Sequence, residues 1–427
     1  MHLITRGQSV PYSFRNLSIN EGLSQSSVVD IAIDDAGFLW LATQDGLNRY
    51  DGRELVIFKK NFDDITTTTG SRLGKIVNGR GNTLWLITSG GRLEKLNLYN
   101  DTFTSVRTID TVVLPPVSCL LQENKNLLWI GTETRGLYGY DPVTNKIVEY
   151  YDYGNEDKPV RAIQYLFKDS NHTLWVLTNS GYARLGRDKK AGHHNEATPP
   201  SGDGISYSVM DEDRNRYLWV GSYGKGLFLK RLQDPAMVPF TGYGGKNSLP
   251  ANLVIETVKV DDAGQIWVGT YGNGLYVIDP ARATINHYVN NKKDPFSISY
   301  NDVLSIKEDK QGGIWIGTDG GGVSHYDKRL NNFAMLAGYN VPEDISIEQV
   351  RAITTDRQGG VWIGTSSTGL TFANKRTNTF ETFHYPPAPD AAGNFDRVVS
   401  LHTDTQGDIW VGTQGNGLLV VDAISKK

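Results

Sequence analysis

The segment VLSIKEDKQGGIWIGTDGGGVSHYD, residues 303–327, decides the fold of this chain. It contains three short runs rich in β-branched and aromatic residues, at 303–308, 314–318 and 323–326, separated by clusters of Gly and Asp. A fourth run follows at 333–336. None of these runs has a helical period, so each is predicted to be a short strand. Closely similar segments begin at Ile255, Val350 and Val398.

The same unit recurs along the whole sequence. Its most regular marker is tryptophan, which recurs every 44 to 48 residues, at Trp40, Trp85, Trp129, Trp175, Trp219, Trp267, Trp315, Trp362 and Trp410. Four short antiparallel strands in roughly 46 residues are typical of one blade of a β-propeller. The sequence therefore predicts an all-β propeller of nine repeats, with strands A to D running outward from a central channel.

Other fixed positions have structural explanations. An acidic residue stands six positions before the tryptophan in eight repeats, while the second repeat has Gly79 there. Thr or Ser stands three positions after every tryptophan. We interpret the acids as acceptors for N–H groups of the A–B turn, and the tryptophans as packing between blades. Acids at equivalent turns around a ring cannot converge on one substrate, which argues against a catalytic role for them.

The ends of the chain predict how the ring closes. The ninth repeat lacks a D strand, whereas residues 12–19 precede the first A strand and resemble the segments between strands D and A. We therefore expect one domain over residues 1–427, a nine-bladed ring whose last blade takes residues 12–19 as its outer strand. The alternative is a seven-bladed propeller followed by two blades of a second. In the fourth repeat, we expect the polar stretch 187–204 to replace or shorten strand D.

Composition excludes several classes of protein. The net charge of −4 provides no basic excess for a nucleic-acid backbone, and the single Cys119 excludes an internal disulfide. No apolar run is long enough for a membrane helix. The first residues show no apolar stretch or cleavage site typical of a signal segment, so we expect either a cytosolic chain or one whose signal segment is absent from this sequence. Common motifs of nucleophilic and zinc-dependent hydrolases are missing, and His193-His194 alone does not make a metal site. Neither a cofactor nor a metal is expected.

The opening segment resembles a known family. Phe14-Arg-Asn-Leu, Glu21-Gly-Leu-Ser and the stretch from Asp34 to Gly52 look like the start of the sensor region of two-component regulator propeller proteins. The repeat D-x-x-G-x-x-W-I-G-T, residues 309–318, is similar to their repeat motif. The resemblance covers essentially the whole chain, which differs in having nine repeats where paired seven-bladed propellers are usual.

The resemblance implies an extracytoplasmic, periplasmic sensor that belongs to a hybrid histidine kinase or, in some relatives, a diguanylate cyclase. Such propellers commonly precede an immunoglobulin-like domain, a membrane helix and an output module. Many of these kinases respond to oligosaccharides and control polysaccharide-use genes. This chain carries no output or membrane module of its own, so it is expected to bind ligand without signalling alone. A homodimer is compatible with this reading.

We expect the ligand at the channel mouth, where the B–C and D–A loops converge. Tyrosine faces can stack on sugar rings, amides and carboxylates can bind hydroxyls, and arginines can bind an acidic sugar. The candidate binding residues are Arg135, Arg161, Tyr223, Lys225, Tyr271, Asn273, Asn301, Asp302, Asp319, Arg351 and Arg397.

Two other functions stay open. One is a polysaccharide-active propeller enzyme, a lyase or a sialidase-like hydrolase. Its acid–base pair would have to be Asp302 and Asp319, the only channel-side acids expected in one blade. The other is a protein-interaction scaffold. The missing catalytic motifs favour a sensor without enzymatic activity.

Overall fold

The computed structural model describes residues 12–58, 73–79, 81–88, 90–152, 162–187, 194–198, 203–231, 234, 236–329, 341–342, 345, 347, 349–374, 379–383 and 397–426. The chain divides into two compact units, Met1–Asn332 and Phe333–Lys427. Both are built of antiparallel sheets, as expected from the repeats.

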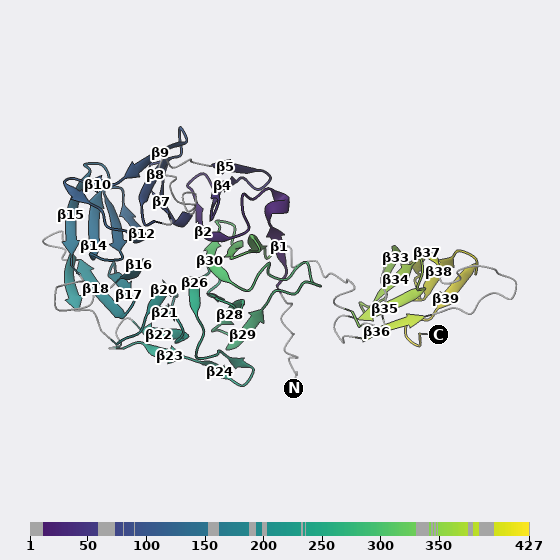
Figure 1. Ribbon diagram of the computed structural model, residues 1–427. Helices are drawn as coiled ribbons and strands as arrows, with labels where there is room; N and C mark the ends of the chain where they lie inside the picture. The colour runs from purple at the N-terminus through teal and green to yellow at the C-terminus, as the bar shows by residue number, and fades with distance from the viewer. Residues whose placement is uncertain are drawn as a thin grey trace. The chain divides into compact units, whose positions relative to one another are not determined.

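The first unit contains seven four-stranded sheets, each written here from its inner strand outward (Figure 1). The first two sheets are β2 (Val28–Ile33), β3 (Leu39–Thr43), β4 (Gly46–Tyr50) and β5 (Leu55–Phe58), then β6 (Leu73–Asn78), β7 (Thr83–Thr88), β8 (Leu93–Asn97) and β9 (Thr102–Val106). The third and fourth are β12 (Val117–Asn124), β13 (Leu127–Thr132), β14 (Leu137–Asp141) and β15 (Lys146–Tyr151), then β16 (Ile163–Lys168), β17 (Leu174–Thr178), β18 (Gly181–Arg187) and β19 (His194–Thr198).

The remaining sheets of this unit follow the same plan. The fifth and sixth are β20 (Tyr207–Glu212), β21 (Tyr217–Ser222), β22 (Leu227–Arg231) and β23 (Val238–Phe240), then β26 (Ile255–Val260), β27 (Ile266–Thr270), β28 (Leu275–Asp279) and β29 (Thr284–Tyr288). The seventh is β30 (Val303–Glu308), β31 (Ile314–Thr318), β32 (Val323–Tyr326) and β1 (Phe14–Leu17). Connecting segments form the 3-10 helix η1 (Ile19–Glu21) and two hairpins, β10 (Thr108–Ile109) with β11 (Val112–Val113) and β24 (Gly242–Gly244) with β25 (Asn247–Ser248).

The seven sheets of the first unit are arranged as a ring. The inner strand of each sheet contacts the inner strand of the next, and β2 of the first sheet contacts β30 of the seventh. Figure 1 shows these inner strands around a common centre. The hydrophobic clusters lie between neighbouring sheets. In one of them, for example, Trp219 of the fifth sheet packs with Ile255 and Ile266 of the sixth.

In its described residues, the second unit forms two sheets. They are β33 (Val350–Thr355), β34 (Val361–Thr365), β35 (Leu370–Asn374) and β36 (Thr379–Phe383), then β37 (Val398–Thr403), β38 (Ile409–Thr413) and β39 (Leu418–Val421). Between these two sheets Trp362 is fully buried, whereas Trp410 of the last sheet is 38% exposed. Among the described residues no further blade covers the tryptophan of the ninth repeat, whereas Trp315 of the seventh repeat packs on the first sheet.

The expected single ring of nine blades over residues 1–427 is wrong. Strand β1 pairs with β32 of the seventh sheet, from Phe14 opposite Tyr326 to Leu17 opposite Val323, and not with the ninth repeat. Aromatic packing explains this choice, because the Tyr12 ring lies 4.3 Å from that of Tyr326 and 5.4 Å from that of Trp267. The alternative of seven blades followed by two others matches the two units.

Two further expectations concern outer strands. The fourth sheet has its outer strand, β19, within the polar stretch, and its five residues equal the length of the outer strands β9 and β29, so the expectation that this stretch replaces or shortens strand D is wrong. The run at 333–336, expected as the outer strand of the seventh repeat, lies outside the described residues. The outer position of that sheet is taken by β1.

The acids before the tryptophans do more than shape turns. In all eight repeats that have one, the carboxylate accepts the indole N–H of the tryptophan, at 2.7–3.1 Å. Most also accept backbone N–H groups of the A–B turn, as Asp261 does from Ala263 and Gln265. In the second repeat, where Gly79 replaces the acid, the Trp85 indole instead donates to Gln122 of the third sheet at 2.9 Å. The turn interpretation of the acids is confirmed and extended.

The Thr or Ser after each tryptophan fixes the B–C turn at the opposite end of the blade. In eight repeats its hydroxyl donates to the carbonyl of the glycine that precedes or opens strand C, at 2.7–3.0 Å. These turns hold the loops that surround the channel.

Candidate ligand-binding site

A cavity of about 460 Å³ lies in the centre of the first unit. It is lined by the inner strands of all seven sheets and by Tyr223 of the fifth B–C loop. Ligand pockets in proteins commonly measure about 300–1,000 Å³. The channel is therefore large enough for a small ligand or for one end of a longer one.

Strand pairing arranges the side chains of the channel in two layers. The first layer consists of the third residue of each inner strand. In six sheets this residue pairs with the one two positions after the tryptophan, and these residues are Asp30, Cys119, Tyr165, Val209, Thr257 and Ser305. Lys75 is the third residue of the inner strand in the second sheet. The second layer consists of the fifth residue of each inner strand, which pairs with the tryptophan itself. These residues are Ala32, Val77, Leu121, Phe167, Asp211, Lys259 and Lys307. Because alternate residues share a face of a strand, both layers turn to the channel.

A β-bulge lies near the start of every inner strand. In the sixth sheet the register shifts between Ile255 and Thr257, with Glu256 as the extra residue. Bulges re-aim side chains and are common beside functional sites. Here the bulge turns Glu256 into the channel lining, close to the mouth.

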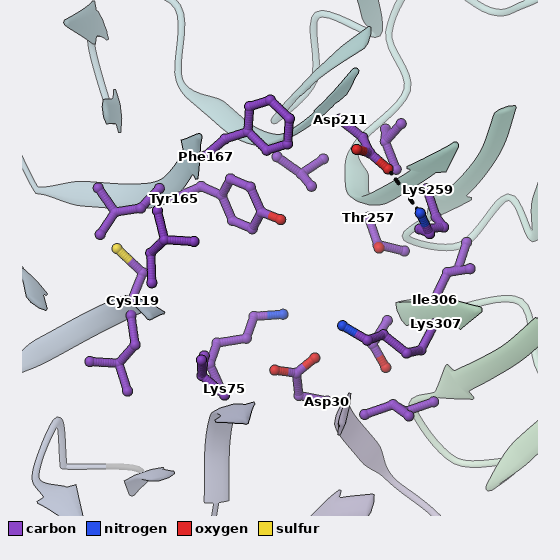
Figure 2. A pocket seen from close by; sticks show the side chains of 18 of the residues that line it. Asp30, Lys75, Cys119, Tyr165, Phe167, Asp211, Thr257, Lys259, Ile306 and Lys307 are labelled. Carbon is purple, nitrogen blue, oxygen red and sulfur yellow. Dashed lines mark ion pairs between the residues drawn. The ribbon is translucent and has the colours of Figure 1, made fainter. Parts of the chain in front are cut away.

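Two acids of the channel have structural partners. Asp30 accepts the backbone N–H of Ile76 in the next sheet at 2.9 Å, and Asp211 accepts that of Val260 at 2.8 Å. Lys259 lies 3.5 Å from Asp211 (Figure 2) and 3.9 Å from Glu308. These contacts connect neighbouring blades, so the four charged side chains Asp30, Asp211, Lys259 and Glu308 stabilise the ring.

Other channel groups have altered acidity. Burial raises the pKa of the Glu256 carboxyl, an effect that Lys75 opposes and Asp302 reinforces. Burial also raises the pKa of the Tyr165 hydroxyl, with smaller contributions from Asp211 and Asp30. Burial and the Glu256 charge raise the pKa of Tyr223 to about 12. Both tyrosines therefore keep their O–H donors at neutral pH.

At the channel mouth, one backbone hydrogen bond connects the B–C loop of a blade to the D–A loop beside it. The donor is the residue directly after the Thr or Ser of the B–C turn. Its backbone N–H donates to the residue just before the inner strand: Tyr223 to Ser206, Tyr271 to Val254, and Asp319 to Asp302, each at 2.9 Å. B–C and D–A loops thus meet at one end of the blades, as expected from the sequence.

Three partly exposed tyrosines gather over the fifth, sixth and seventh sheets. Tyr223, Tyr271 and Tyr300 are 41%, 55% and 44% exposed. The Tyr300 ring lies against the seventh B–C loop, where a side-chain atom added at Gly320 would be 3.5 Å from it. Asp302 accepts the backbone N–H of Gly272, next to Tyr271, at 2.6 Å. Asp319 accepts the hydroxyl of Ser27. These bonds hold the loops that carry the tyrosines.

The other predicted residues of the first unit differ in whether their side chains take part in loop hydrogen bonds. Arg135 and Lys225 lie in the third and fifth B–C loops. Asn273 donates to the Tyr271 carbonyl, and Asn301 accepts the backbone N–H of Asn290, so both amides support loops. Arg161 lies outside the described residues. The structure thus brings Tyr223, Tyr271, Asp302 and Asp319 to neighbouring blades of one mouth.

Arg351 and Arg397 belong to the second unit, so the expectation that all eleven residues surround one channel is wrong in this respect. Each binds a residue of its own repeat: Arg351 donates to the Ser366 hydroxyl at 2.7 Å and Arg397 to the Gln414 amide oxygen at 2.8 Å. The error follows from the blade count, because repeats eight and nine were placed in the same ring as the others.

The sequence analysis missed the channel lining itself. Lys75, Tyr165, Glu256 and Lys307 are on inner strands, whereas the residues predicted from the sequence belong to loops. The sequence does contain a pattern that indicates these four residues, because they are polar residues at the second, third or fifth position of strand A. Among the described residues, no three His, Cys, Asp or Glu side chains gather as metal ligands. No helix in the described part of the chain is long and apolar enough to cross a membrane.

Comparison with known proteins agrees with this architecture. Residues 297–320, 344–367 and 392–415 match the family described as two component regulator propeller. Histidine kinase P4 of Formosa agariphila is 42% identical over 62 residues, which are 14% of this chain and 4% of that protein.

Two solved structures share the fold. An extracellular domain described as that of a hybrid two component system from B. thetaiotaomicron has a TM-score of 0.68 at 22% identity, covering 97% of this chain and 54% of that one. Virginiamycin B lyase from Staphylococcus aureus has a TM-score of 0.55 at 12% identity, covering 74% of this chain and 99% of the lyase. The chain therefore spans about half of the first structure and a small part of the kinase.

Proposed function

Because this chain carries the repeats of two-component regulator propeller proteins, we propose that it is the periplasmic ligand-sensing part of a hybrid histidine kinase. In this proposal it binds an oligosaccharide at the channel mouth of the first unit and catalyses no reaction. The extracellular domain of a two-component system with the same fold supports a sensor on the outer side of the membrane.

One observation carries the choice of ligand. Tyr223, Tyr271 and Tyr300 are exposed on adjacent blades above a cavity, in a unit where most large apolar side chains are buried. Exposed aromatic groups beside hydrogen-bonding groups mark binding surfaces more than structural ones. Tyrosine faces suit the C–H surfaces of sugar rings, and the polar groups of the mouth suit their hydroxyls.

The alternative of a lyase or a hydrolase has less support. A lyase shares the fold. However, both members of the acid pair expected for catalysis, Asp302 and Asp319, accept hydrogen bonds from other residues around the channel mouth. Asp302 accepts an N–H of Gly272, and Asp319 accepts the Ser27 hydroxyl. General acid–base catalysis needs two groups free to exchange protons with substrate. Incubation with candidate polysaccharides should therefore produce no new reducing ends and no unsaturated products.

The binding proposal can be tested with an oligosaccharide panel. Thermal unfolding should identify a stabilising sugar, since a ligand that binds only the native state raises its stability. Isothermal titration of Tyr223→Ala and Tyr271→Ala should then show affinity about ten-fold lower, equivalent to about 1.4 kcal/mol. The control is Lys310→Ala, whose side chain donates to the Asp35 carbonyl in the A–B turns at the opposite end of the blades.

Unchanged affinity in both tyrosine variants, with loss in the Lys310 variant, would place the ligand on the other face. Product formation by the wild-type chain that Asp302→Asn or Asp319→Asn abolishes would favour an enzyme over a sensor.

A further inference from the structure

The channel below the mouth contains polar groups that have no protein partner. Among the described residues, Lys75, Lys307, Tyr165 and Glu256 line the cavity, and their side chains make no hydrogen bond or ion pair with another residue. Figure 2 shows the amines of Lys75 and Lys307 and the hydroxyl of Tyr165 pointing into the open centre. Polar groups in such positions are satisfied by water or by a ligand.

The charged groups of the channel differ in whether another protein group already binds them. Asp30 and Asp211 already accept backbone N–H groups, and Lys259 already lies beside Asp211 and Glu308. Among the residues that the structure describes, no carboxylate lies within ion-pair distance of Lys75 on β6 or Lys307 on β30. Both flank β2, because the first sheet lies between the second and the seventh. The ammonium groups of Lys75 and Lys307 thus outnumber the one carboxylate between them, that of Asp30 on β2, so this side of the channel has a net positive charge (Figure 2).

We infer that this part of the channel binds an anionic group, the carboxylate or sulfate ester of an acidic sugar, between Lys75 and Lys307. The inference rests on the proposed function and narrows its ligand from oligosaccharides in general to acidic ones. Two ammonium groups supply the charge, and the Tyr165 hydroxyl donates a hydrogen bond. A charge in a partly enclosed site is stabilised more by an opposite charge than one in open water.

Glu256 gives the ligand a direction. It lies at the bulge near the start of β26, close to Tyr223 and the mouth, and the charge of Lys75 acts on its carboxyl from within the channel. A carboxyl there can accept or donate to sugar hydroxyls, and its negative form disfavours an anionic group near the mouth. The acidic group of the ligand is thus placed deep in the channel, with its neutral remainder at the three tyrosines.

The first experiment uses a probe that does not depend on the sugar. Thermal unfolding of the full chain is compared in sodium sulfate and in sodium chloride at equal ionic strength. Sulfate stabilises most proteins without binding, so the informative quantity is the difference between wild type and the Lys75→Met/Lys307→Met variant. We expect a larger sulfate-induced rise in melting temperature for wild type. Lys310→Met, at the other end of the blades, should match wild type.

The second experiment separates the carboxylate from the sulfate ester and the sugar from its charge. Isothermal titration compares an oligogalacturonide, a sulfated galactan oligosaccharide and their neutral counterpart. The preferred acidic form should bind at least about ten-fold more tightly than the neutral one, and the double lysine variant should lose this preference. Since the free lysines are not paired, that variant should melt no lower than wild type in the absence of ligand.

The outcomes distinguish the two proposals. Equal sulfate responses in wild type and the double variant overturn the anion site, while binding of a neutral sugar that depends on Tyr223 and Tyr271 leaves the proposed function intact. Binding that depends on Lys75 and Lys307 but not on the tyrosines supports the anion site and contradicts the mouth as proposed.

Discussion

The indole N–H of each repeat's tryptophan is a polar group that the fold must satisfy inside its core. Eight repeats use an acid six residues earlier, and the second uses Gln122 of the following sheet. Gly79 makes this possible, because a side-chain atom added there would lie 2.9 Å from the Trp85 indole nitrogen. The repeat thus replaces a local acceptor by one that joins two blades.

This substitution leads to a test at Gln122. Gln122→Leu leaves the buried Trp85 N–H without an acceptor and should lower the free energy of unfolding by about 1–3 kcal/mol. In a Trp85→Phe background the same change should cost clearly less, because no N–H remains to be satisfied. Equal costs in the two backgrounds, measured by urea denaturation, would contradict the role given to this bond.

His325 introduces pH dependence at the closing sheet. Its ring stacks on Trp315 with centroids 3.7 Å apart, and its Nε2 has no hydrogen-bond partner. Burial lowers the pKa of His325, while Asp309 and Asp327 oppose this shift and Arg15 and Arg329 add to it. The unfolded chain therefore binds the proton more readily than the folded chain does.

Stability should consequently fall as the pH drops below about 6.5, the ordinary His value, until the folded pKa is reached. The slope from this single group cannot exceed about 1.4 kcal/mol per pH unit. His325→Phe places at this position the residue type that the eighth repeat has beside its own tryptophan, where Phe372 contacts Trp362, and should remove this part of the acid sensitivity. The measurement is urea denaturation of the wild type and the variant at pH 7.5 and at pH 5.5. If both proteins lose the same free energy of unfolding between these pH values, His325 does not contribute to the acid sensitivity.

At the scale of the element, β1 closes the first unit. It covers the edge of β32, its Phe14 is 1% exposed, and Phe14 packs with Tyr288 and Tyr326. Deleting residues 1–17 removes this strand and exposes an open sheet edge with apolar side chains.

We expect that deletion to lower the melting temperature sharply and to promote association, detectable by size-exclusion chromatography. Phe14→Ala keeps the strand and should cause an intermediate loss of about 3–5 kcal/mol at most, the usual cost for a buried Phe. Wild-type melting of the deletion variant would show that β1 is not needed for closure.

The strands themselves could be predicted closely, but their assembly could not. The runs at 303–308, 314–318 and 323–326 coincide with β30, β31 and β32, because Gly and Asp turns define strand ends locally. The number of blades in a ring is not local: near-identical repeats pack equally well in rings of different size. The partner of β1 depends on contacts of Tyr12 and Phe14 with residues more than 250 positions away.

The same reason limits what could be predicted of the site. Tyr223, Tyr271, Asp302 and Asp319 were found because B–C and D–A loops meet at one end of any blade. Arg351 and Arg397 were assigned to that mouth only through the blade count. Lys75, Lys307 and Glu256 were missed because their position depends on how seven inner strands face one another, which no single repeat encodes.

At the scale of the whole molecule, the first unit has the contacts of a complete fold. Its ring of seven sheets is continuous, and 99% of a lyase with the same fold aligns to 74% of this chain. A fragment of residues 1–332 should therefore unfold cooperatively and bind the same ligand with the affinity of the full chain, within about two-fold. Calorimetry and titration check this. Loss of binding by a folded fragment would show that residues beyond 332 contribute to the site.

The most direct test of the central claim is a crystal structure of the chain with its bound oligosaccharide. We predict that a sugar ring lies over Tyr223 and Tyr271 at the channel mouth, with the remainder directed into the channel. Density for the ligand at the A–B turns on the opposite face, or only in the second unit, would contradict it.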